Sequence, residues 1–285
     1  MSSSETVRFF WHGSPLGPYQ LMGMRSFVNR GHSVELFTYD STIAVPAWIV
    51  RRDANEIWPT DHILTYRDGA SRGNFALHAN LFRYAMLHRL GGWWIDHDVI
   101  LLREALPAQD IFFSLEAVDP ISATNSVLKF PAGHPAMADC VARCVAAGET
   151  PLYGETASVL FTEIAAKYRL PRNERSTDAT YPLSALDVPA MFDPAERDQL
   201  RARCENATFV HLFNEKWRRA GIPNDLGPPA GSFIDDVLRA HGGEAPSPRM
   251  AVDDVKRWTA CLTRQPAPAF AISASASAAL EACRD

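Results

Sequence analysis

The sequence predicts an α/β fold with a mixed, largely parallel central sheet and flanking helices. Short apolar runs alternate with amphipathic segments along the 285 residues, and the first unit reads strand, helix, strand. A connection through a helix places its two strands parallel, with a right-handed crossover. Hydrophobic residues make up 47% of the chain and charged residues 21%, which is typical of a globular protein.

The remaining elements follow from periodicity and end signals. Strands are expected at 7–11, 33–39, 93–101, 111–115, 126–130 and 208–213, and helices at 19–30, 74–90, 135–147, 155–168, 232–240 and 253–262. The helix over 74–90 is the clearest, because Gly91 ends it and apolar residues recur at spacings of three and four. Residues 1–245 are expected to form one domain, followed by a helical or flexible appendage over 246–285.

Charge and composition exclude some classes of protein. The formal net charge of −5 argues against a protein that binds nucleic acid mainly through phosphate contacts. The chain has no apolar run of transmembrane length and no signal-peptide layout at its start, so we expect a cytoplasmic protein. The five cysteines are dispersed and are expected to be reduced and mostly buried.

The most informative feature is a pair of aspartates, Asp96 and Asp98, inside the apolar run after Gly91-Gly92. On a strand, residues two apart point to the same side, so both carboxylates would face one ligand. Two such charges repel unless a cation or hydrogen-bond donors compensate them. The pair therefore indicates a divalent metal and phosphate chemistry. The alternative is a turn at a strand end, in which the aspartates cap backbone amides.

Other candidates each have a functional and a structural interpretation. Asn80 and Arg83 share a helix face and would contact a sugar and a phosphate, or else form a solvated face. Trp11 and Trp94 would stack on a flat ring or belong to the core.

Three later segments carry further polar candidates. His211 and Asn214 are competent metal ligands that would complete a site otherwise made of carboxylates, although a lone histidine is more often structural. Glu155 begins a helix and would either cap it or contact a polar substrate. Asn125 precedes a strand and is equally typical of a turn.

Together these motifs resemble the sugar-binding region of DXD-containing glycosyltransferases, in particular family 32 and the clostridial glucosylating toxins. The resemblance rests on four segments in the same order: Phe10–Gly13, Asn80–Val99, Gly154–Thr156 and His211–Trp217. It implies a GT-A fold, which is a Rossmann-like nucleotide-sugar-binding fold. It also implies a Mn²⁺ or Mg²⁺ ion, a nucleotide-diphosphate sugar as donor substrate, with UDP-sugars favoured, and retention at the anomeric carbon.

The resemblance also implies partners and a setting. The acceptor would be a saccharide or a glycolipid in bacterial-type polysaccharide biosynthesis, and peripheral association with the inner face of the cytoplasmic membrane is compatible with it. No nucleic acid partner is expected. The chain departs from the family pattern at Asn80, where Asp is usual, at Trp94, where Tyr is usual, and after Gly154, where Pro is usual.

Site roles carry over residue by residue. Asp98 would bind the metal, with His211 and Asn214 completing its shell, while Asp96 would contact the ribose and the donor sugar. The other residues implied in nucleotide-sugar binding are Trp11, His12, Gly13, Asn80, Arg83, Trp94 and Trp217, the last on a flexible closing loop. Those implied in catalysis are Asp96, Asp98, Asn125 and Glu155, and a covalent route would need Glu155 or Glu116 as nucleophile. A same-face displacement without a protein nucleophile is preferred.

Two alternatives remain open at this stage. A phosphotransferase or phosphatase would use Asp96 as its nucleophile, although that class normally carries the motif on its first strand. A non-catalytic nucleotide-sugar binder would keep the same site without turnover.

Overall fold

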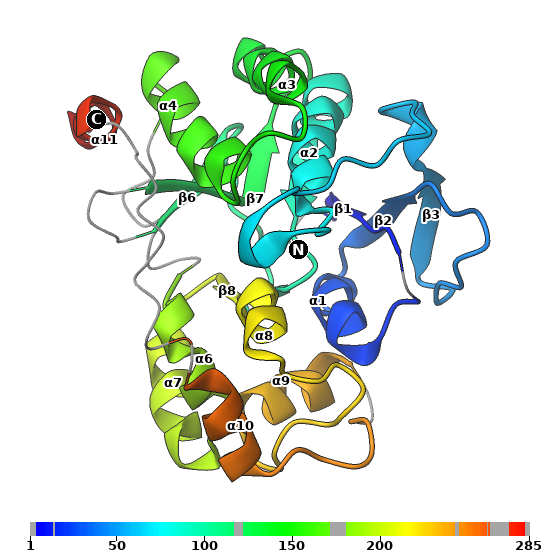
Figure 1. The fold of residues 1–285 in the computed structure, drawn as a ribbon, viewed down its shortest axis with the longest axis vertical. Helices are drawn as coiled ribbons and strands as arrows, with labels where there is room; N and C mark the ends of the chain where they lie inside the picture. Colours follow the sequence, from blue (N-terminus) through cyan, green and yellow to red (C-terminus); the bar gives the residue numbers. More distant parts are fainter. Residues whose placement is uncertain are drawn as a thin grey trace.

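A six-stranded sheet lies at the centre of the computed structural model, in the order β3-β2-β1-β4-β7-β6 (Figure 1). The structure describes residues 4–13, 15–116, 122–171, 181–242, 245–260, 262 and 274–282. The first four strands in this order run parallel, and β7 and β6 run antiparallel to their neighbours. The strands are β1 (Thr6–Phe10), β2 (Ser33–Thr38), β3 (Ile49–Asp53), β4 (Gly92–Ile95), β6 (Phe112–Glu116) and β7 (Ser122–Phe130). The predicted mixed, largely parallel α/β architecture is confirmed.

A second sheet contains two antiparallel strands, β5 (Val99–Leu101) and β8 (Phe209–His211). The prediction of one strand over 93–101 is therefore wrong. After Ile95 the chain leaves the large sheet and turns, and the backbone N–H of Val99 donates to the carbonyl of Asp96 at 3.0 Å. Apolar residues stand on both sides of this turn, so the pattern alone did not reveal it.

Helices cover the two faces of the large sheet unequally. On one face α2 (Ala76–Leu90), α3 (Pro135–Ala147) and α4 (Leu160–Lys167) pack over a core that includes Phe10 and Trp94 (Figure 1). On the other face α1 (Pro18–Val28) packs over Phe9 and Trp93. The alternation of side chains along β4 thus sends Trp94 toward α2 and Trp93 toward α1.

A third core lies below the sheet in Figure 1, among α6 (Val188–Met191), α7 (Arg197–Cys204), α8 (Asn214–Ala220), α9 (Phe233–His241) and α10 (Val252–Thr259). Ile100 of β5 and Met22 of α1 also belong to it. Met250 and Val255, which follow the expected domain boundary at residue 245, are buried in the same core. Helix α11 (Ala274–Ala282) lies against α4.

Several helical boundaries differ from the prediction. The helix expected over 155–168 begins with a π-helical turn, η3 (Glu155–Val159), in which Ala157 has non-helical torsions, and only then continues as α4. Strand β3 and helices α6, α7 and α8 were not expected. Four short 3₁₀-helices complete the described elements: η1 (Ala54–Glu56), η2 (Gly69–Ser71), η4 (Ala185–Asp187) and η5 (Pro194–Glu196). Within the described residues, no helix has both the length and the apolar character needed to cross a bilayer.

The described cysteines are Cys140, Cys144 and Cys204, and all three are buried free thiols, as expected. Cys261 and Cys283 lie outside the described residues.

Candidate active site

The turn Asp96-His97-Asp98 joins the large sheet to the small one. The backbone N–H of Asp96 still bonds to Ser126 of β7, at 2.8 Å, whereas the carbonyl of Asp98 accepts from Leu212, just after β8, at 2.9 Å. The two carboxylates therefore do not share a strand face, and each meets a different set of partners. Helix α1 supports the turn closely, because a Cβ added at Gly23 would overlap the carbonyl oxygen of His97.

Asp96 faces a cation supplied by α2. Its Oδ1 lies 3.0 Å from Arg83 Nη2 and accepts from Trp94 Nε1 at 2.8 Å, while the Arg83 guanidinium lies 5.0 Å from the Trp94 ring centre. Burial raises the pKa of Asp96, the Arg83 charge opposes that rise, and the Asp98 charge adds to it. The two aspartates are thus close enough for their charges to interact, although they lie on a turn and not on one strand face.

A buried amide network lies beside Arg83. Asn125 stands within β7 rather than in a turn, and its carbonyl accepts from Arg83 Nη1. Its side-chain amide donates to Asn80 Oδ1 at 3.2 Å and to Tyr84 OH at 2.9 Å, and Asn80 donates to Thr156 Oγ1 at 3.1 Å. The structure therefore brings Asn80, Arg83 and Asn125 together, but Asn80 is only 3% exposed and its amide bonds to protein groups.

Asp98 faces the segment that follows β8. The pairing of β5 with β8 sets Val99 opposite His211, which places His211 Nε2 3.2 Å from Asp98 Oδ2. The backbone N–H of Asn214 donates to the same oxygen at 2.8 Å. Phe213, between them, adopts left-handed torsions (φ 57°, ψ 48°), which direct the chain from the strand into α8.

The ionisation of this pair follows from its partners. Burial raises the pKa of Asp98. The adjacent His211, His97 and the Asn214 amide together lower it by more than burial raises it, so the net pKa is well below its usual range. Burial lowers the pKa of His211, but the Asp98, Asp96 and Glu116 carboxylates together outweigh burial, and the net pKa is raised.

The residues around Asp98 are compatible with a bound cation. His211 Nδ1 and Asn214 Oδ1 are both buried and have no hydrogen-bond partner among the described residues. No group of three His, Cys, Asp or Glu side chains in the part of the chain that the structure describes is placed to hold a metal ion, so a metal here would need the Asn214 amide oxygen. Carboxylate and amide oxygens suit Mg²⁺ and Mn²⁺. The predicted ligands Asp98, His211 and Asn214 therefore fit a Mg²⁺ or Mn²⁺ ion. Water would fill its remaining coordination positions.

The predicted base-binding residues lie at the end of β1. Trp11 is 7% exposed and contacts Phe75 and His97 edge-to-face, with ring centres 5.8 and 5.1 Å away. His12 follows it, and its Nδ1 is buried without a partner among the described residues. Gly13 has φ 102°, which allows the chain to turn sharply after the strand. Trp11 thus reaches the aspartate turn through His97.

Trp217 does not lie where it was expected. It is 1% exposed within α8, where its ring contacts Tyr19 and Phe192 edge-to-face. The expectation of a flexible closing loop is wrong, because residues 214–220 form a helix whose apolar face packs into the third core.

The two candidate glutamates occupy different places. Glu155 is exposed, and its carboxylate accepts from the Leu152 backbone N–H at 2.8 Å, so it bonds to the turn before the helix and does not cap the helix itself. Glu116, half-buried at the end of β6, has a pKa that burial raises and that the nearby His211 and Lys216 lower. Only Glu116 therefore lies near the aspartates' partners.

Tyr181 is a residue that sequence reasoning missed. Its hydroxyl lies 2.6 Å from Ser126 Oγ, and its ring centre lies 5.5 Å from that of His211. It stands in irregular chain between elements, so no periodicity or motif marks it.

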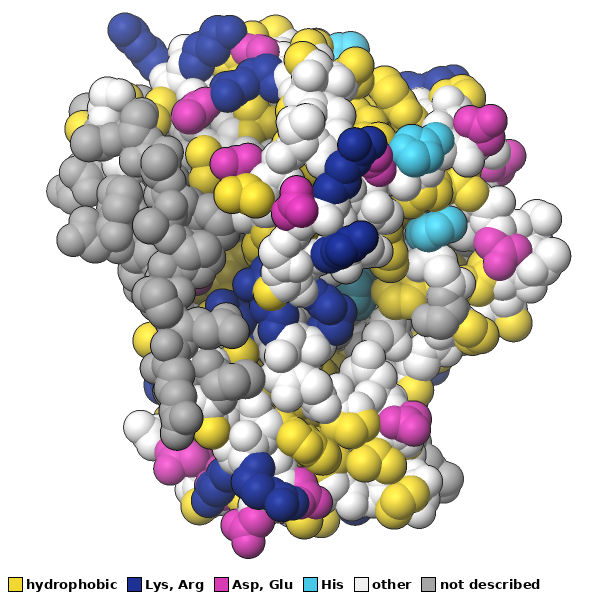
Figure 2. Space-filling model, in the orientation of Figure 1, with side chains coloured by type: hydrophobic (Ala, Val, Ile, Leu, Met, Phe, Trp, Pro, Cys, Tyr) yellow, Lys and Arg dark blue, Asp and Glu magenta, His cyan; other side chains and the backbone are white. Residues whose placement is uncertain are grey.

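Basic side chains gather around a hollow near the centre of the face shown in Figure 2, over α8 and the segment before α2. Helix α8 carries three basic residues, Lys216, Arg218 and Arg219, of which the last two are paired with Glu215. An overall negative protein thus presents a locally positive surface beside its aspartate turn, which suits an anionic ligand.

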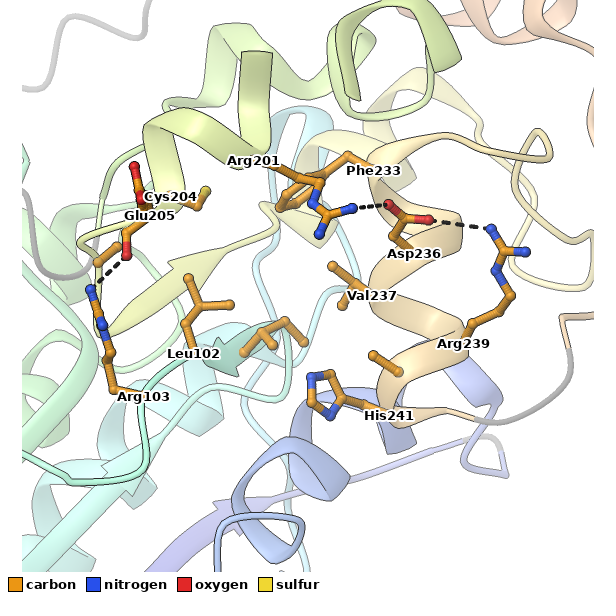
Figure 3. Close-up of a pocket in the computed structure, with 13 residues that line it drawn as sticks. Leu102, Arg103, Arg201, Cys204, Glu205, Phe233, Asp236, Val237, Arg239 and His241 are labelled. Carbon is orange, nitrogen blue, oxygen red and sulfur yellow. Dashed lines mark hydrogen bonds and ion pairs between the residues drawn. The ribbon is translucent and has the colours of Figure 1, made fainter. Parts of the chain in front are cut away.

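A different hollow, of about 490 Å³, lies between α7 and α9 beyond the far end of β5 (Figure 3). Its arginines are engaged with protein groups: Arg201 and Arg239 bond to Asp236, and Arg103 bonds to the Glu205 carbonyl. None of the predicted site residues lines it.

Residues 34–125 match the family model of the glycosyltransferase sugar-binding region containing DXD motif. The matched segment contains Asn80, Arg83, Asp96, Asp98 and Asn125, and the resemblance to DXD-containing glycosyltransferases is confirmed over it. A solved structure titled PaToxG Glycosyltransferase is similar over 83% of this chain and 87% of that chain, with 11% identity and a TM-score of 0.46. No curated protein matches the chain in sequence.

Proposed function

We propose that the protein is a metal-dependent, retaining glycosyltransferase that moves a sugar from a nucleotide-diphosphate sugar to a saccharide or glycolipid. The observation that supports the proposal most strongly is that the two aspartates of the turn face different partners. Asp96 meets a fixed cation, Arg83, and Asp98 meets His211 and the start of α8. The turn also lies within the segment that matches the DXD-containing sugar-binding region.

On the Asp98 side, Asp98, His211 and Asn214 would hold the Mn²⁺ or Mg²⁺ ion. When bound, the ion would supply positive charge to offset the charge that develops on a diphosphate leaving group. The unpartnered Nδ1 of His211 and Oδ1 of Asn214 support this assignment, because buried polar atoms normally have partners.

On the Asp96 side, Arg83 would bind an oxygen of the donor substrate. Its guanidinium is fixed by Asp96, by the Asn125 carbonyl and by the face of Trp94. Its Nε is buried and has no partner among the described residues, so one N–H remains for a phosphate or sugar oxygen. A charge held in place before the reaction needs little reorganisation as negative charge develops on the leaving group.

Retention would proceed without a protein nucleophile. Glu155 is exposed and bonds to the turn before η3, which argues against one of the two carboxylates considered for a covalent route. UDP is the favoured nucleotide on the family resemblance alone.

The test is a panel of UDP-, GDP- and CMP-sugars with Mn²⁺, assayed for nucleotide release and for a glycosylated product. Turnover with one nucleotide-sugar class is expected, and Asp98→Asn should abolish this metal-dependent turnover. Asp198→Asn is the matched control, because Asp198 is 81% exposed and remote from the turn, and it should keep full activity. Release of phosphate from simple phosphoesters would instead support a phosphatase. Binding of a nucleotide-sugar without turnover for any acceptor would support a non-catalytic binder.

A further inference from the structure

Glu215, the second residue of α8, is a largely buried carboxylate that joins two distant segments. Its side chain is 16% exposed. It accepts from Ser71 Oγ at 2.8 Å and from Asn74 Nδ2 at 2.7 Å, both in the segment that leads into α2. It also accepts from Arg218 and Arg219 of its own helix, at 2.8 and 2.9 Å. One carboxylate thus receives hydrogen bonds from both segments.

The two arginines extend the same junction. Arg218 Nη2 donates to the carbonyl of Ala70 at 2.7 Å, and Arg219 Nη2 donates to Ser71 Oγ at 2.6 Å. Arg219 also lies over the ring of Tyr153, 4.4 Å from its centre. We call this set of bonds between residues 70–74 and α8 the clasp.

Helix α8 needs such support. It has seven residues, too few for a helix to be stable by itself, and it starts from the left-handed torsions of Phe213. Its first residue, Asn214, donates its backbone N–H to Asp98 Oδ2. Any shift of the helix start therefore moves a direct partner of Asp98.

We infer that Glu215 is a positioning residue, which fixes the start of α8 against residues 70–74 and so holds the Asn214 amide on Asp98. The inference rests on the proposed function for its catalytic consequence, but not for the clasp itself. Groups that orient a metal ligand change metal affinity or activity by about 10- to 100-fold when they are removed.

The first experiment measures amide hydrogen exchange on the metal-free protein, so it needs no activity. Glu215→Ala should speed exchange in both 66–76 and 211–220, and Glu215→Gln, which keeps one acceptor oxygen, should do so less. Glu149→Gln is the matched control. Glu149 is 13% exposed and binds Thr65 and Arg67, but it does not reach α8. Unchanged exchange over 211–220 in Glu215→Ala would overturn the inference.

The second experiment titrates Mn²⁺ by electron paramagnetic resonance and measures kcat and KM. Glu215→Ala should weaken Mn²⁺ binding about tenfold, with partial rescue in Glu215→Gln and no change in Glu149→Gln. Faster exchange with unaltered Mn²⁺ affinity and kcat/KM would show that the clasp does not position Asp98, and would refute the inference. If the native protein neither binds Mn²⁺ nor turns over any nucleotide-sugar, the proposed function fails, and exchange over 211–220 still decides whether Glu215 holds α8.

Discussion

Replacing Arg83 with Met tests how strongly the aspartate turn depends on its fixed cation. The side chain of Arg83 is 5% exposed, and its change to Met keeps much of the volume while removing the charge. Asp96 would keep the Trp94 N–H as a partner but lose its only ion pair among the described residues. The Asn125 carbonyl would lose the Arg83 donor as well.

The expected cost follows from the burial of each group. Breaking a buried ion pair by removing one partner costs about 3–5 kcal/mol. The Asp96 side chain is 24% exposed, so water compensates in part and we expect the lower end, about 3 kcal/mol. Asp96→Asn should also destabilise, because it leaves the Arg83 charge without its carboxylate. The double variant removes both charges and should cost about 2 kcal/mol less than the sum of the single variants.

The assay is urea unfolding of the metal-free protein at neutral pH, read as a double-mutant cycle. Asp110→Asn with Arg83→Met provides a control pair, because Asp110 has no ion pair with Arg83 and the two changes should be additive. If Arg83→Met and Asp96→Asn were additive to within about 0.5 kcal/mol, the ion pair would not stabilise the turn and the reasoning would be refuted.

Variants at three further positions test other parts of the structure. Trp217→Ala should lower the free energy of unfolding in urea by about 3–5 kcal/mol. Trp217→Phe should leave the KM for the nucleotide-sugar within about twofold of the native value. A large increase in KM without a loss of stability would instead support a place for Trp217 in the binding site. Burial lowers the pKa of His78 from about 6.5 to about 4, so protonation favours the unfolded chain. Stability should therefore fall by up to about 3 kcal/mol as pH drops from 6.5 to 4, and a pH profile unchanged in His78→Gln would contradict this. Gly23→Ala should lower the free energy of unfolding by about 1–3 kcal/mol and weaken Mn²⁺ binding, because the added Cβ would displace His97. An Mn²⁺ affinity equal to that of the native protein would show that α1 does not fix the position of the aspartate turn.

The parts of the fold that could be predicted are those with a repeating pattern and a clear end. Helix α3 begins and ends where the sequence predicted, since Pro135 starts it and Gly148 follows it. The parallel pairing of β1 with β2 could be predicted from the strand–helix–strand order at the start of the chain. The junction of the two sheets could not be predicted in the same way, because Ile95 and Val99 are both apolar and buried and only a hydrogen-bond pattern distinguishes one strand from two.

The site was predicted by residue type better than by geometry. Asp98, His211 and Arg83 lie together around the aspartate turn, and their roles toward a ligand stay predictions, whereas Asn125 stands in a strand and Trp217 in a core. Tyr181 carried no signal at all. Long-range pairing decides these positions: β8 reaches β5 across more than a hundred residues, and a single sequence does not reveal that register.

The junction at residues 96–98 has a consequence for how the protein unfolds. Asp96 is bonded into the large sheet, whereas Asp98 is bonded to β8 and α8, whose helix packs in the third core. Separately packed cores can open at different denaturant concentrations. A ligand that contacts both aspartates binds only when both cores are folded, so it raises the cooperativity of unfolding as well as its free energy. Substrate-bound protein should therefore unfold as one unit, even where the third core of the free protein unfolds before the large sheet.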